Sequence, residues 1–513
     1  MRLSKRMVIA PVSHFLKSPL TSTWKIAILI MRLVIVELVI GGLVMFVGRK
    51  NELEILNKAY QKDSFQFPVI YGRRRVGKTT LINNFCKNKK TIYFVAVQST
   101  AKENLEILSA QILSALAPEA PKNPFSSFRD AFEYVFNQAM HERIIFTIDE
   151  YPYLAKSNSA VSSILQAAID KHQENSKLFL ILCGSSMSFM EKQILSSKSP
   201  LYGRRTSQLK LLPFDYLESA EMLPGFTNEE KIIFYSITGG IPEYLFRVDN
   251  QLSLQENVRD LFFDPSGRLF EEPTNLLKQE LKIPETYNAI ITAVADGSSK
   301  LNEIATKVDI ETSQCSKMLA TLISLGLVRK EYPVTETNSK KSIYLLADGM
   351  FIFWYRFVLP DLSRITAGLG ETVCEEVFEE QLANHTGHAF EECVKQYMWR
   401  VLKKKESPIS FKKIGRWWGS NPKERREEEI DFIAFSGDKA IFGECKWRGA
   451  QIGEDVLNEL VRKSALFPQF KSSHYMLFSK SGFKTSLRDK AEKQDNILLV
   501  GLDELFFSGT ETP

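Results

Sequence analysis

Short apolar runs alternate with longer segments of helical periodicity between residue 46 and about residue 245. The runs have the length and the β-branched content of buried strands, and helical-length segments separate most of them. The predicted strands are residues 68–71, 91–96, 144–149, 178–183 and 207–211. This alternation predicts an α/β unit in which helices cover a parallel sheet. A mostly helical stretch follows, over about residues 228–281.

Residues 284–350 have a different pattern. The predicted elements are helices over 285–295, 301–308 and 311–325 and strands over 327–332 and 342–346. Gly326 is a plausible end for the third helix, and a polar turn joins the two strands. Three helices followed by a β-hairpin is the order of a winged helix-turn-helix.

The last third of the chain begins with an aromatic run, residues 351–359, which leads into an acidic helical segment. From about residue 381 the pattern is α+β. Within it, a strand over 430–435 and a return strand over 439–447 flank the turn Ser436-Gly437-Asp438. This arrangement predicts a tight β-hairpin.

The first 44 residues admit more than one interpretation. Residues 24–47 are long enough to span a bilayer, but Arg32 and Glu37 would place two charges near its middle. No small-residue cleavage site follows a short apolar core, so a signal peptide fits poorly. Gly41 and Gly42 precede Met45, and their GGN codons can contain a ribosome-binding sequence. We therefore predict that residues 1–44 are a translated leader absent from the native protein; an apolar membrane anchor is the alternative.

The composition of the 513-residue chain is that of a soluble globular protein, with 44% apolar and 25% charged residues. A net charge of +5 permits a local basic surface but does not by itself indicate nucleic-acid binding. The six cysteines form no C-x-x-C pair, which fits a reducing cytosol and argues against a disulfide framework. His385 and His388 lack a nearby third ligand, so we interpret them as surface residues. The expected location is the cytoplasm.

The strongest motif is Gly72-Arg73-Arg74-Arg75-Val76-Gly77-Lys78-Thr79, followed by Thr80, which matches G-x-x-x-x-G-K-[ST]. It lies between the predicted strand 68–71 and an apolar-periodic helix. Glycines let the backbone wrap around phosphate, and the turned N–H groups and the helix N-terminus attract its charge. Lys78 would reach the β- and γ-phosphates, and the Thr79 hydroxyl would ligate Mg²⁺.

The second half of a nucleotide site is predicted at the end of another strand, in Ile144-Ile145-Phe146-Thr147-Ile148-Asp149-Glu150. Asp149 would hold the magnesium through its water shell, and Glu150 would polarise the attacking water. The two motifs together predict a P-loop nucleotide hydrolase.

Further segments resemble an AAA-like ATPase family that is common in archaea and some bacteria. The resemblance covers residues 46–250 in order. Besides the two motifs above, it rests on Phe46-Val47-Gly48-Arg49, Tyr151-Pro152-Tyr153-Leu154, Cys183-Gly184-Ser185-Ser186, Pro200-Leu201-Tyr202-Gly203-Arg204-Arg205 and Gly239-Gly240-Ile241-Pro242-Glu243-Tyr244. The last of these resembles the proline turn of signalling-type (STAND) ATPases in that clade.

The resemblance implies further roles. Ser185 or Ser186 would sense the γ-phosphate. Arg204 or Arg205 would be an arginine finger, which acts on a neighbouring subunit or within the chain, so a homo-oligomer is expected. The implied nucleotide-binding residues outside the loop and the acidic pair are Gly48, Arg49, Ser185, Ser186 and Pro242. A preference for ATP over GTP follows from the resemblance alone.

The predicted hairpin gathers two carboxylates and a lysine. Pairing about Gly437 sets Asp431 opposite Gly443 or Glu444, and Glu444 and Lys446 share a face because strand side chains alternate. Two acids can bind Mg²⁺, and a lysine can stabilise the attacking hydroxide or the developing charge. The pattern therefore indicates metal-assisted phosphodiester cleavage.

The spacing D-x12-E-x-K resembles the restriction-endonuclease-like PD-(D/E)xK superfamily, although Ile430 stands where the proline of that name would be. An earlier acid in such folds comes from a helix, and Glu391 in Gly387-His388-Ala389-Phe390-Glu391-Glu392 is the match, as a further metal ligand. The ATPase family often carries such a domain at its end, so one resemblance covers residues 46–500. DNA is the implied partner.

The predicted organisation is a leader (1–44), a P-loop ATPase core (45–227), a helical lid (228–283), a winged helix (284–350), an aromatic and acidic connector (351–380) and a nuclease-like domain (381–513).

Two functions are compatible with this organisation: an ATPase that acts on DNA through the nuclease-like domain, or a nucleotide-controlled switch whose C-terminal domains bind DNA or a protein without cleavage. The complete acid–lysine set favours the first. Only Lys317 is basic on the recognition helix, with Lys340 and Lys341 on the wing, which favours the second and a winged helix used for packing.

Overall fold

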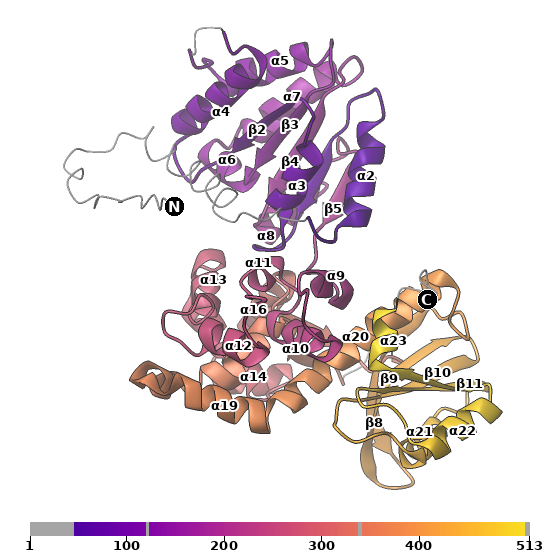
Figure 1. Ribbon diagram of the computed structural model, residues 1–513. Coiled ribbons are helices and arrows are strands. Elements are labelled where there is room, and N and C mark those ends of the chain that lie inside the picture. The colour runs from indigo at the N-terminus through magenta and orange to yellow at the C-terminus, as the bar shows by residue number, and fades with distance from the viewer. Residues whose placement is uncertain (1–45, 120–122, 337–340, 508–513) are drawn as a thin grey trace, which may run out of the picture. The chain divides into compact units, whose positions relative to one another are not determined.

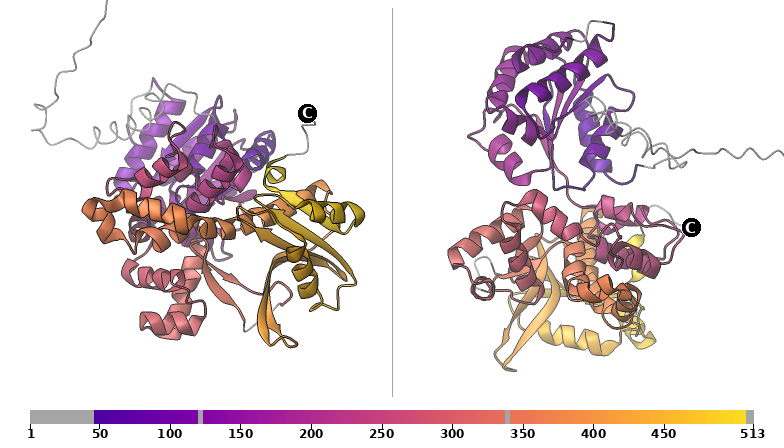
Figure 2. Two further views of the ribbon diagram at one scale, coloured as in Figure 1. Left: turned by 60° about the horizontal axis from the view of Figure 1, so that its bottom comes forward. Right: turned by 90° about the vertical axis from the view of Figure 1, so that its left-hand side faces the viewer.

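Figures 1 and 2 show the computed structural model of the chain, which describes residues 46–119, 123–336 and 341–507. The leader or membrane anchor predicted over residues 1–44 lies outside these ranges. Among the helices that the structure describes, none has both the length and the apolar character needed to cross a membrane.

Five parallel strands form the first sheet, in the order β2-β3-β4-β1-β5 (Figure 1). They are β1 (Pro68–Tyr71), β2 (Thr91–Val95), β3 (Ile145–Asp149), β4 (Phe179–Gly184) and β5 (Ser207–Lys210). Each begins and ends within one residue of its predicted bounds. The strands β1, β3 and β4 are buried along their whole length, as expected for central strands that helices cover on both faces.

The direction of each crossover between parallel strands determines which face of the first sheet its helices cover. The connection from β1 to β2 runs toward one edge of the sheet through α3 (Lys78–Cys86), whereas the next two connections run back in the opposite direction. Because parallel crossovers are right-handed, α3 lies on one face and the helices between β2 and β4 lie on the other. The latter are α4 (Ala101–Leu116), α5 (Phe128–Gln138), α6 (Tyr151–Ser157) and α7 (Val161–His172). The first described helix, α2 (Lys50–Tyr60), packs beside α3.

After β4 the chain forms the short helix α8 (Met187–Phe189) and the π-helix η1 (Met190–Leu195) and returns to the sheet as β5. A helical segment follows β5. It contains α9 (Tyr216–Glu221), α10 (Asn228–Thr238), α11 (Pro242–Leu245), α12 (Leu254–Phe262) and α13 (Glu272–Glu280). Capping boxes at Asp215, Thr227 and Ser253 begin three of these helices, because each side chain accepts a hydrogen bond from an otherwise unpaired backbone N–H. Helix α10 ends at Gly239, whose left-handed backbone (φ 62°) suits glycine.

The next elements have the predicted order of three helices and a hairpin. They are α14 (Pro284–Ala295), α15 (Leu301–Val308), α16 (Thr312–Ser324), β6 (Val328–Glu331) and β7 (Ile343–Leu346). The two strands pair antiparallel, from Val328 opposite Leu346 to Glu331 opposite Ile343. The order and bounds agree with the sequence pattern; the assignment as a winged helix stays a prediction.

The aromatic run forms α17 (Gly349–Phe353) and η2 (Trp354–Val358), and α18 (Leu362–Arg364), η3 (Ile365–Leu369) and α19 (Gly370–Glu380) follow. The aromatic side chains of the run are buried, and the Trp354 indole donates a 2.6 Å hydrogen bond to the backbone oxygen of Phe270. The connector is thus part of the core of the helical segment.

A mixed five-stranded sheet forms the end of the chain, in the order β12-β11-β10-β9-β8. The helices are α20 (Leu382–Lys404), α21 (Glu454–Ser464), α22 (Thr485–Lys493) and α23 (Leu502–Phe506), and the strands are β8 (Lys413–Asn421), β9 (Arg426–Ser436), β10 (Lys439–Lys446), β11 (Ser472–Ser479) and β12 (Ile497–Gly501). The strands β8, β9 and β10 pair antiparallel, and β10, β11 and β12 pair parallel. One face of the sheet packs on α20 and α23, and the other packs on α21 and α22.

The histidine interpretation was wrong for His385. Its ring is buried between Phe353 and Phe357, and Nε2 lies 3.1 Å from the backbone oxygen of Ser236. The reason is that α20 lies against α10 and the aromatic run, which the sequence pattern does not show. His388, one turn later, is exposed as predicted.

Candidate functional sites

The nucleotide loop follows β1 and leads into α3. Gly77 precedes the helix with a left-handed backbone (φ 84°), which suits glycine. At Gly72, a Cβ atom would lie 2.5 Å from the backbone oxygen of Leu211, so this position has no room for a side chain. Lys78 is buried, and its Nζ donates hydrogen bonds to the backbone oxygens of Gly72 (2.9 Å) and Arg73 (2.8 Å). Burial lowers the pKa of Lys78.

The first acid of the predicted pair lies beside the loop. Asp149 Oδ2 accepts hydrogen bonds from the Thr79 hydroxyl (3.0 Å) and from the Tyr93 hydroxyl (2.8 Å), and Oδ1 accepts one from the backbone N–H of Glu150 (2.8 Å). The structure therefore brings together the two predicted magnesium ligands, Thr79 and Asp149, one from each motif. A hydroxyl and a carboxylate are hard oxygen ligands of the kind that Mg²⁺ takes.

The second acid, Glu150, is oriented by the next strand. Its backbone is left-handed (φ 50°), and its carboxylate accepts hydrogen bonds from the Ser185 hydroxyl at 2.8 and 2.9 Å. Ser185 follows the end of β4, the neighbour of β3 in the sheet. Ser186 directly precedes α8. Of the two serines predicted to sense the γ-phosphate, Ser185 is the one that contacts the acidic pair.

Two segments from the resemblance adjoin the loop. The Arg49 guanidinium donates to the backbone oxygens of Val76 (2.8 Å) and Leu212 (2.7 Å) and lies over the ring of Phe214. It follows Gly48, which has a left-handed backbone (φ 67°). The ring of Pro242 lies 3.9 Å from where a Cβ of Gly77 would be. The structure therefore places Arg49 and Pro242 against the loop; their roles in nucleotide binding stay predictions.

The three arginines of the loop each contact an acid far away in the sequence. Arg73 pairs with Asp348, which follows β7, and both side chains are buried. Arg74 Nε lies 2.7 Å from Glu280 of α13 and also donates to the Tyr153 hydroxyl at 3.0 Å. Arg75 pairs with Glu272, also of α13. Sequence reasoning treated these arginines as loop residues and missed their partners, because no local pattern indicates contacts between residues about 200 or more apart in the sequence.

The two candidate arginine-finger residues make contacts within the chain. Arg204 donates two hydrogen bonds to Asp170, at 2.6 and 2.7 Å, and this pairing raises the pKa of Arg204. Arg205 donates to the backbone oxygen of Leu195 and lies over the ring of Tyr202. A finger role for either residue stays a prediction.

The second candidate site lies on β9 and β10. Their register pairs Gly443 with Phe432, and Glu444 and Asp431 are the next residues of the two strands. Asp431 Oδ2 accepts a 2.7 Å hydrogen bond from the backbone N–H of Cys445, and Lys446 Nζ donates one to Glu444 Oε1 at 2.6 Å. The predicted convergence of Asp431, Glu444 and Lys446 is therefore observed.

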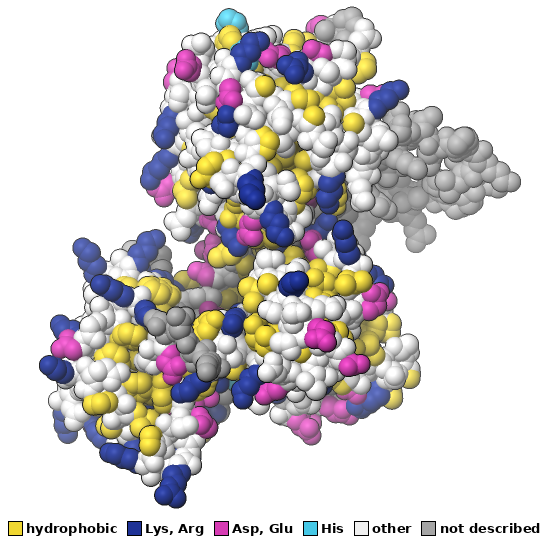
Figure 3. Space-filling view, turned by 180° about the vertical axis from the view of Figure 1, so that it is seen from behind, with side chains coloured by type: hydrophobic (Ala, Val, Ile, Leu, Met, Phe, Trp, Pro, Cys, Tyr) yellow, Lys and Arg dark blue, Asp and Glu magenta, His cyan; other side chains and the backbone are white. Residues whose placement is uncertain are grey.

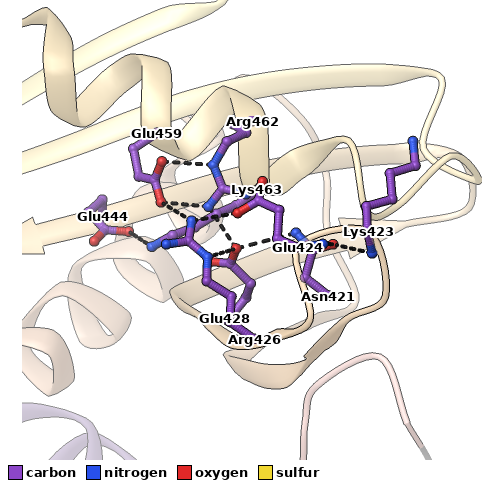
Figure 4. A network of polar contacts seen from close by, with 9 residues as sticks. All are labelled: Asn421, Lys423, Glu424, Arg426, Glu428, Glu444, Glu459, Arg462 and Lys463. Atoms are coloured by element: carbon purple, nitrogen blue, oxygen red, sulfur yellow. Dashed lines mark hydrogen bonds and ion pairs between the residues drawn. The ribbon is translucent and has the colours of Figure 1, made fainter.

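A second lysine approaches the same carboxylate from α21. Lys463 Nζ lies 3.8 Å from Glu444 Oε2 (Figure 4). Beside it, Arg462 donates to Glu424 (2.6 Å) and Glu428 (2.7 Å) of the β8–β9 hairpin. This network fixes α21 against the sheet and with it the position of Lys463. No sequence motif indicated Lys463.

Electrostatics at the hairpin favour a bound cation. Burial and the nearby charges of Glu444 and Glu391 raise the pKa of Asp431 to about 7, against the opposing effect of Lys446. Glu444 Oε2 is buried and has no hydrogen-bond partner among the described residues. A buried carboxylate oxygen that accepts no hydrogen bond, beside a second carboxylate, is an arrangement that a divalent cation would stabilise. The residues present thus fit a metal held by Asp431 and Glu444.

The predicted three-acid metal set needs correction at Glu391. Within the part of the chain that the structure describes, no group of three or more acidic, histidine or cysteine side chains is placed to hold one ion. Glu391 instead lies 3.5 Å from His388 Nδ1 on its own helix, while Asp431 turns to the backbone of Cys445. Glu391 acts on Asp431 through its charge alone.

Comparisons with known proteins agree with the first site. A family model described as an ATPase domain predominantly from Archaea matches residues 46–248, and one described as archaeal and bacterial proteins of unknown function matches residues 354–459. The solved structure of the Walker-type ATPase PABY2304 of Pyrococcus abyssi is similar, with 18% identity and a TM-score of 0.45 over 61% of this chain and 96% of that chain.

Relatives in Methanocaldococcus jannaschii are closer in sequence. The ATP-binding protein MJ0423 is 53% identical over 49 residues, which is 10% of this chain and 83% of that protein. The protein MJECL04 is 34% identical over 427 residues, which cover 82% of this chain and 92% of that protein. Since this likeness spans nearly all of the relative, the chain belongs to the same family as MJECL04, and its residues 46–248 are an ATPase domain of a type found predominantly in Archaea.

Proposed function

We propose that this ATPase acts on DNA and that its C-terminal sheet domain cleaves phosphodiester bonds with a divalent metal. The observation that carries the proposal is the convergence of Asp431, Glu444 and Lys446 on one hairpin, with Glu444 Oε2 buried and accepting no hydrogen bond from the described residues. Two neighbouring carboxylates with an oxygen available to a cation are typical of a metal-dependent site.

At the nucleotide site, Thr79 and Asp149 would hold Mg²⁺, and Lys78 would move from the loop carbonyls to the phosphates. Bound Mg²⁺ supplies neutralisation of the phosphate charge. Glu150 accepts a proton from water as the water oxygen bonds to the γ-phosphorus and the bond to the β–γ bridging oxygen breaks. ADP leaves with the electron pair of that bond. Ser185 keeps the Glu150 carboxylate directed at this position.

At the hairpin site, Asp431 and Glu444 would hold the cation, which supplies Lewis-acid stabilisation of the reacting phosphate. Lys446 holds the water or hydroxide that attacks phosphorus, or the negative charge that develops there. Its ammonium is held in place by Glu444, and the charges of Glu444 and Asp431 outweigh burial to raise the pKa of Lys446, so it stays protonated. The P–O bond to the leaving nucleoside breaks, and that oxygen takes a proton from solvent.

Cleavage is tested with the purified full-length chain on single-stranded, duplex and branched DNA. We expect cleavage that needs Mg²⁺ or Mn²⁺ and stops with EDTA. Asp431→Ala should abolish it while ATP turnover continues, because the ATP site is built from other residues. Lys446→Ala should lower the rate about a hundredfold or more while metal binding persists.

The matched control is Asp438→Ala, because Asp438 is an exposed acid in the turn of the same hairpin. It should cleave at the wild-type rate. If the wild-type chain cleaves none of the DNA forms, with or without ATP, the nuclease proposal fails.

The second candidate function is a nucleotide-controlled switch without cleavage. The loop arginines favour it, because Arg73, Arg74 and Arg75 connect the nucleotide loop directly to α13 and to Asp348. Nucleotide that moves the loop would then act on the elements that follow. A protein with this coupling and no metal-dependent cleavage would fit the switch.

We propose a homo-oligomer because an arginine finger would act on the nucleotide of a neighbouring subunit. For Arg204 to reach a neighbouring subunit, its two hydrogen bonds to the partly exposed Asp170 must open. Such surface pairs contribute about 0–1 kcal/mol, so opening is feasible.

A further inference from the structure

A group of lysines marks the end of α20 and the adjoining edge of the C-terminal sheet. Lys403 and Lys404 end the helix, Lys405 is its C-cap, Lys412 lies directly before β8, and Lys413 begins that strand. All five are exposed, and none makes an ion pair with any residue that the structure describes. Five other lysines of this part of the chain, Lys395, Lys446, Lys463, Lys480 and Lys490, are each paired with a glutamate. The remaining lysines without a pair among the described residues are dispersed along the sequence, whereas Lys403, Lys404 and Lys405 are consecutive, as are Lys412 and Lys413.

An exposed tryptophan lies among these lysines. The side chain of Trp399 is 48% exposed, and its ring lies 5.2 Å from the ring of Phe411 in a tilted arrangement. Phe411 is buried and directly precedes Lys412. Lys403 follows Trp399 by four residues, so the two share one side of the helix. The tryptophan therefore connects the lysines at the end of α20 to Lys412 in one surface, here called the lysine–tryptophan surface (Trp399, Lys403, Lys404, Lys405 and Lys412). Lys413 lies over the ring of Phe435, on the face of the sheet that packs on α21 and α22, and adds charge at the same edge.

Few acidic residues accompany this surface: the pKa of Glu54 of α2 is lowered by Lys58, with a smaller contribution from the charge of Lys403. Glu406 is the one acid between Trp399 and Lys413. Neighbouring ammonium groups repel one another, and such a cluster raises the local potential and attracts polyanions. On the face in Figure 3, lysine and arginine side chains gather along the outer edge of the part that contains this sheet.

We infer that the lysine–tryptophan surface binds a single strand of DNA. Lysines neutralise backbone phosphates and thereby supply affinity without sequence preference. An exposed aromatic ring offers a base a stacking partner, and only an unpaired base has a free face for it. A duplex would use the lysines but not Trp399. The choice of DNA rests on the proposed function; the preference for a single strand rests on Trp399.

The test is the binding of a fluorescent 20-nucleotide strand to the full-length chain, measured by anisotropy in EDTA so that no cleavage occurs. Lys403→Ala/Lys404→Ala/Lys405→Ala should weaken binding about tenfold or more and reduce the slope of log K against log salt by about 2, since each phosphate contact of a single strand contributes about 0.7. Trp399→Ala should weaken binding about tenfold, whereas Trp399→Phe should retain most of it, because a phenyl ring also stacks.

The control is Lys62→Ala/Lys87→Ala/Lys102→Ala, which removes three exposed lysines of the ATPase core that likewise make no ion pair with described residues. This variant should bind as the wild type does. The inference is overturned if the two triple variants bind equally, or if a duplex of the same sequence binds as tightly as the strand and Trp399→Ala changes neither. Asp431→Ala separates this inference from the nuclease: it should lose cleavage and keep strand binding.

Discussion

The backbone of Glu150 is left-handed, an uncommon state for a glutamate, and the Ser185 hydroxyl holds its carboxylate. Non-glycine residues in this region cost about 1–3 kcal/mol and cluster at functional sites. Glu150 directly follows Asp149 in the sequence, and Asp149 accepts a hydrogen bond from Thr79 of the nucleotide loop. This arrangement separates binding, done by the loop and Asp149, from the proton transfer assigned to Glu150.

We predict that Glu150→Gln keeps ATP binding and lowers turnover by about a hundredfold or more, because an amide accepts no proton from water. Lys78→Ala should weaken ATP binding itself, because it removes a charge that would contact the phosphates. Isothermal titration with Mg-ATP and phosphate release measure the two effects. Glu142→Gln, at an exposed acid that pairs with Lys90, is the matched control. Turnover at the wild-type rate in Glu150→Gln would refute the assigned role.

At the scale of single residues, the sequence predicted the parts of the nucleotide site that consist of consecutive residues. The loop and the acidic pair are contiguous, so their residue types alone indicate phosphate binding and water activation. The roles of Ser185 and Lys463 were harder to predict. Ser185 contacts Glu150 because β4 lies next to β3 in the sheet. The sequence alone did not distinguish Ser185 from Ser186 as the residue at the nucleotide site. Lys463 reaches Glu444 from α21, a helix that its buried leucines and the ion pairs of Arg462 with the β8–β9 hairpin hold on the sheet.

At the scale of elements, apolar periodicity predicted strands and helices well, because each buried face repeats with the period of its element. The pattern did not predict which helices pack together. His385 shows this: α20 packs on α10, which buries a histidine that looked like a surface residue.

Burial in this packing lowers the pKa of His385 to about 4, below its usual value near 6.5. The unfolded chain therefore binds more protons between pH 4 and 6.5, so stability falls as the pH falls through this window. At pH 5 the loss is about 2 kcal/mol relative to pH 7.5. We predict that His385→Gln, whose amide can still donate to the Ser236 oxygen, shows a smaller fall in the unfolding midpoint between these pH values.

The control for this prediction is His388→Gln, which changes an exposed histidine on the same helix. Its midpoint should fall with pH as the wild type does. Equal pH dependence in all three proteins, measured by thermal unfolding at pH 7.5 and 5, would show that His385 titrates normally in the fold.

At the scale of the whole molecule, the nucleotide loop and the C-terminal half are connected by ion pairs. The Arg73–Asp348 pair is the most buried of the three, with 9% and 1% of the side chains exposed. Breaking such a pair leaves a buried charge, at a typical cost of 3–5 kcal/mol. The backbone oxygen of Arg73 also accepts a hydrogen bond from Lys78. A change at Asp348 therefore reaches the lysine that would contact the phosphates.

We predict that Asp348→Asn and Arg73→Met each weaken ATP binding about tenfold, because the loop loses its fixed conformation. The double variant should bind about as each single variant does, since either change already breaks the pair. The coupling free energy in this cycle should be about 1 kcal/mol or more, measured by titration with Mg-ATP. The exposed pair Lys307–Asp296 is the control, and Lys307→Met with Asp296→Asn should leave ATP binding unchanged. Strictly additive effects at Arg73 and Asp348 would mean that the pair only holds the fold, and that ATP does not act on the C-terminal half through it.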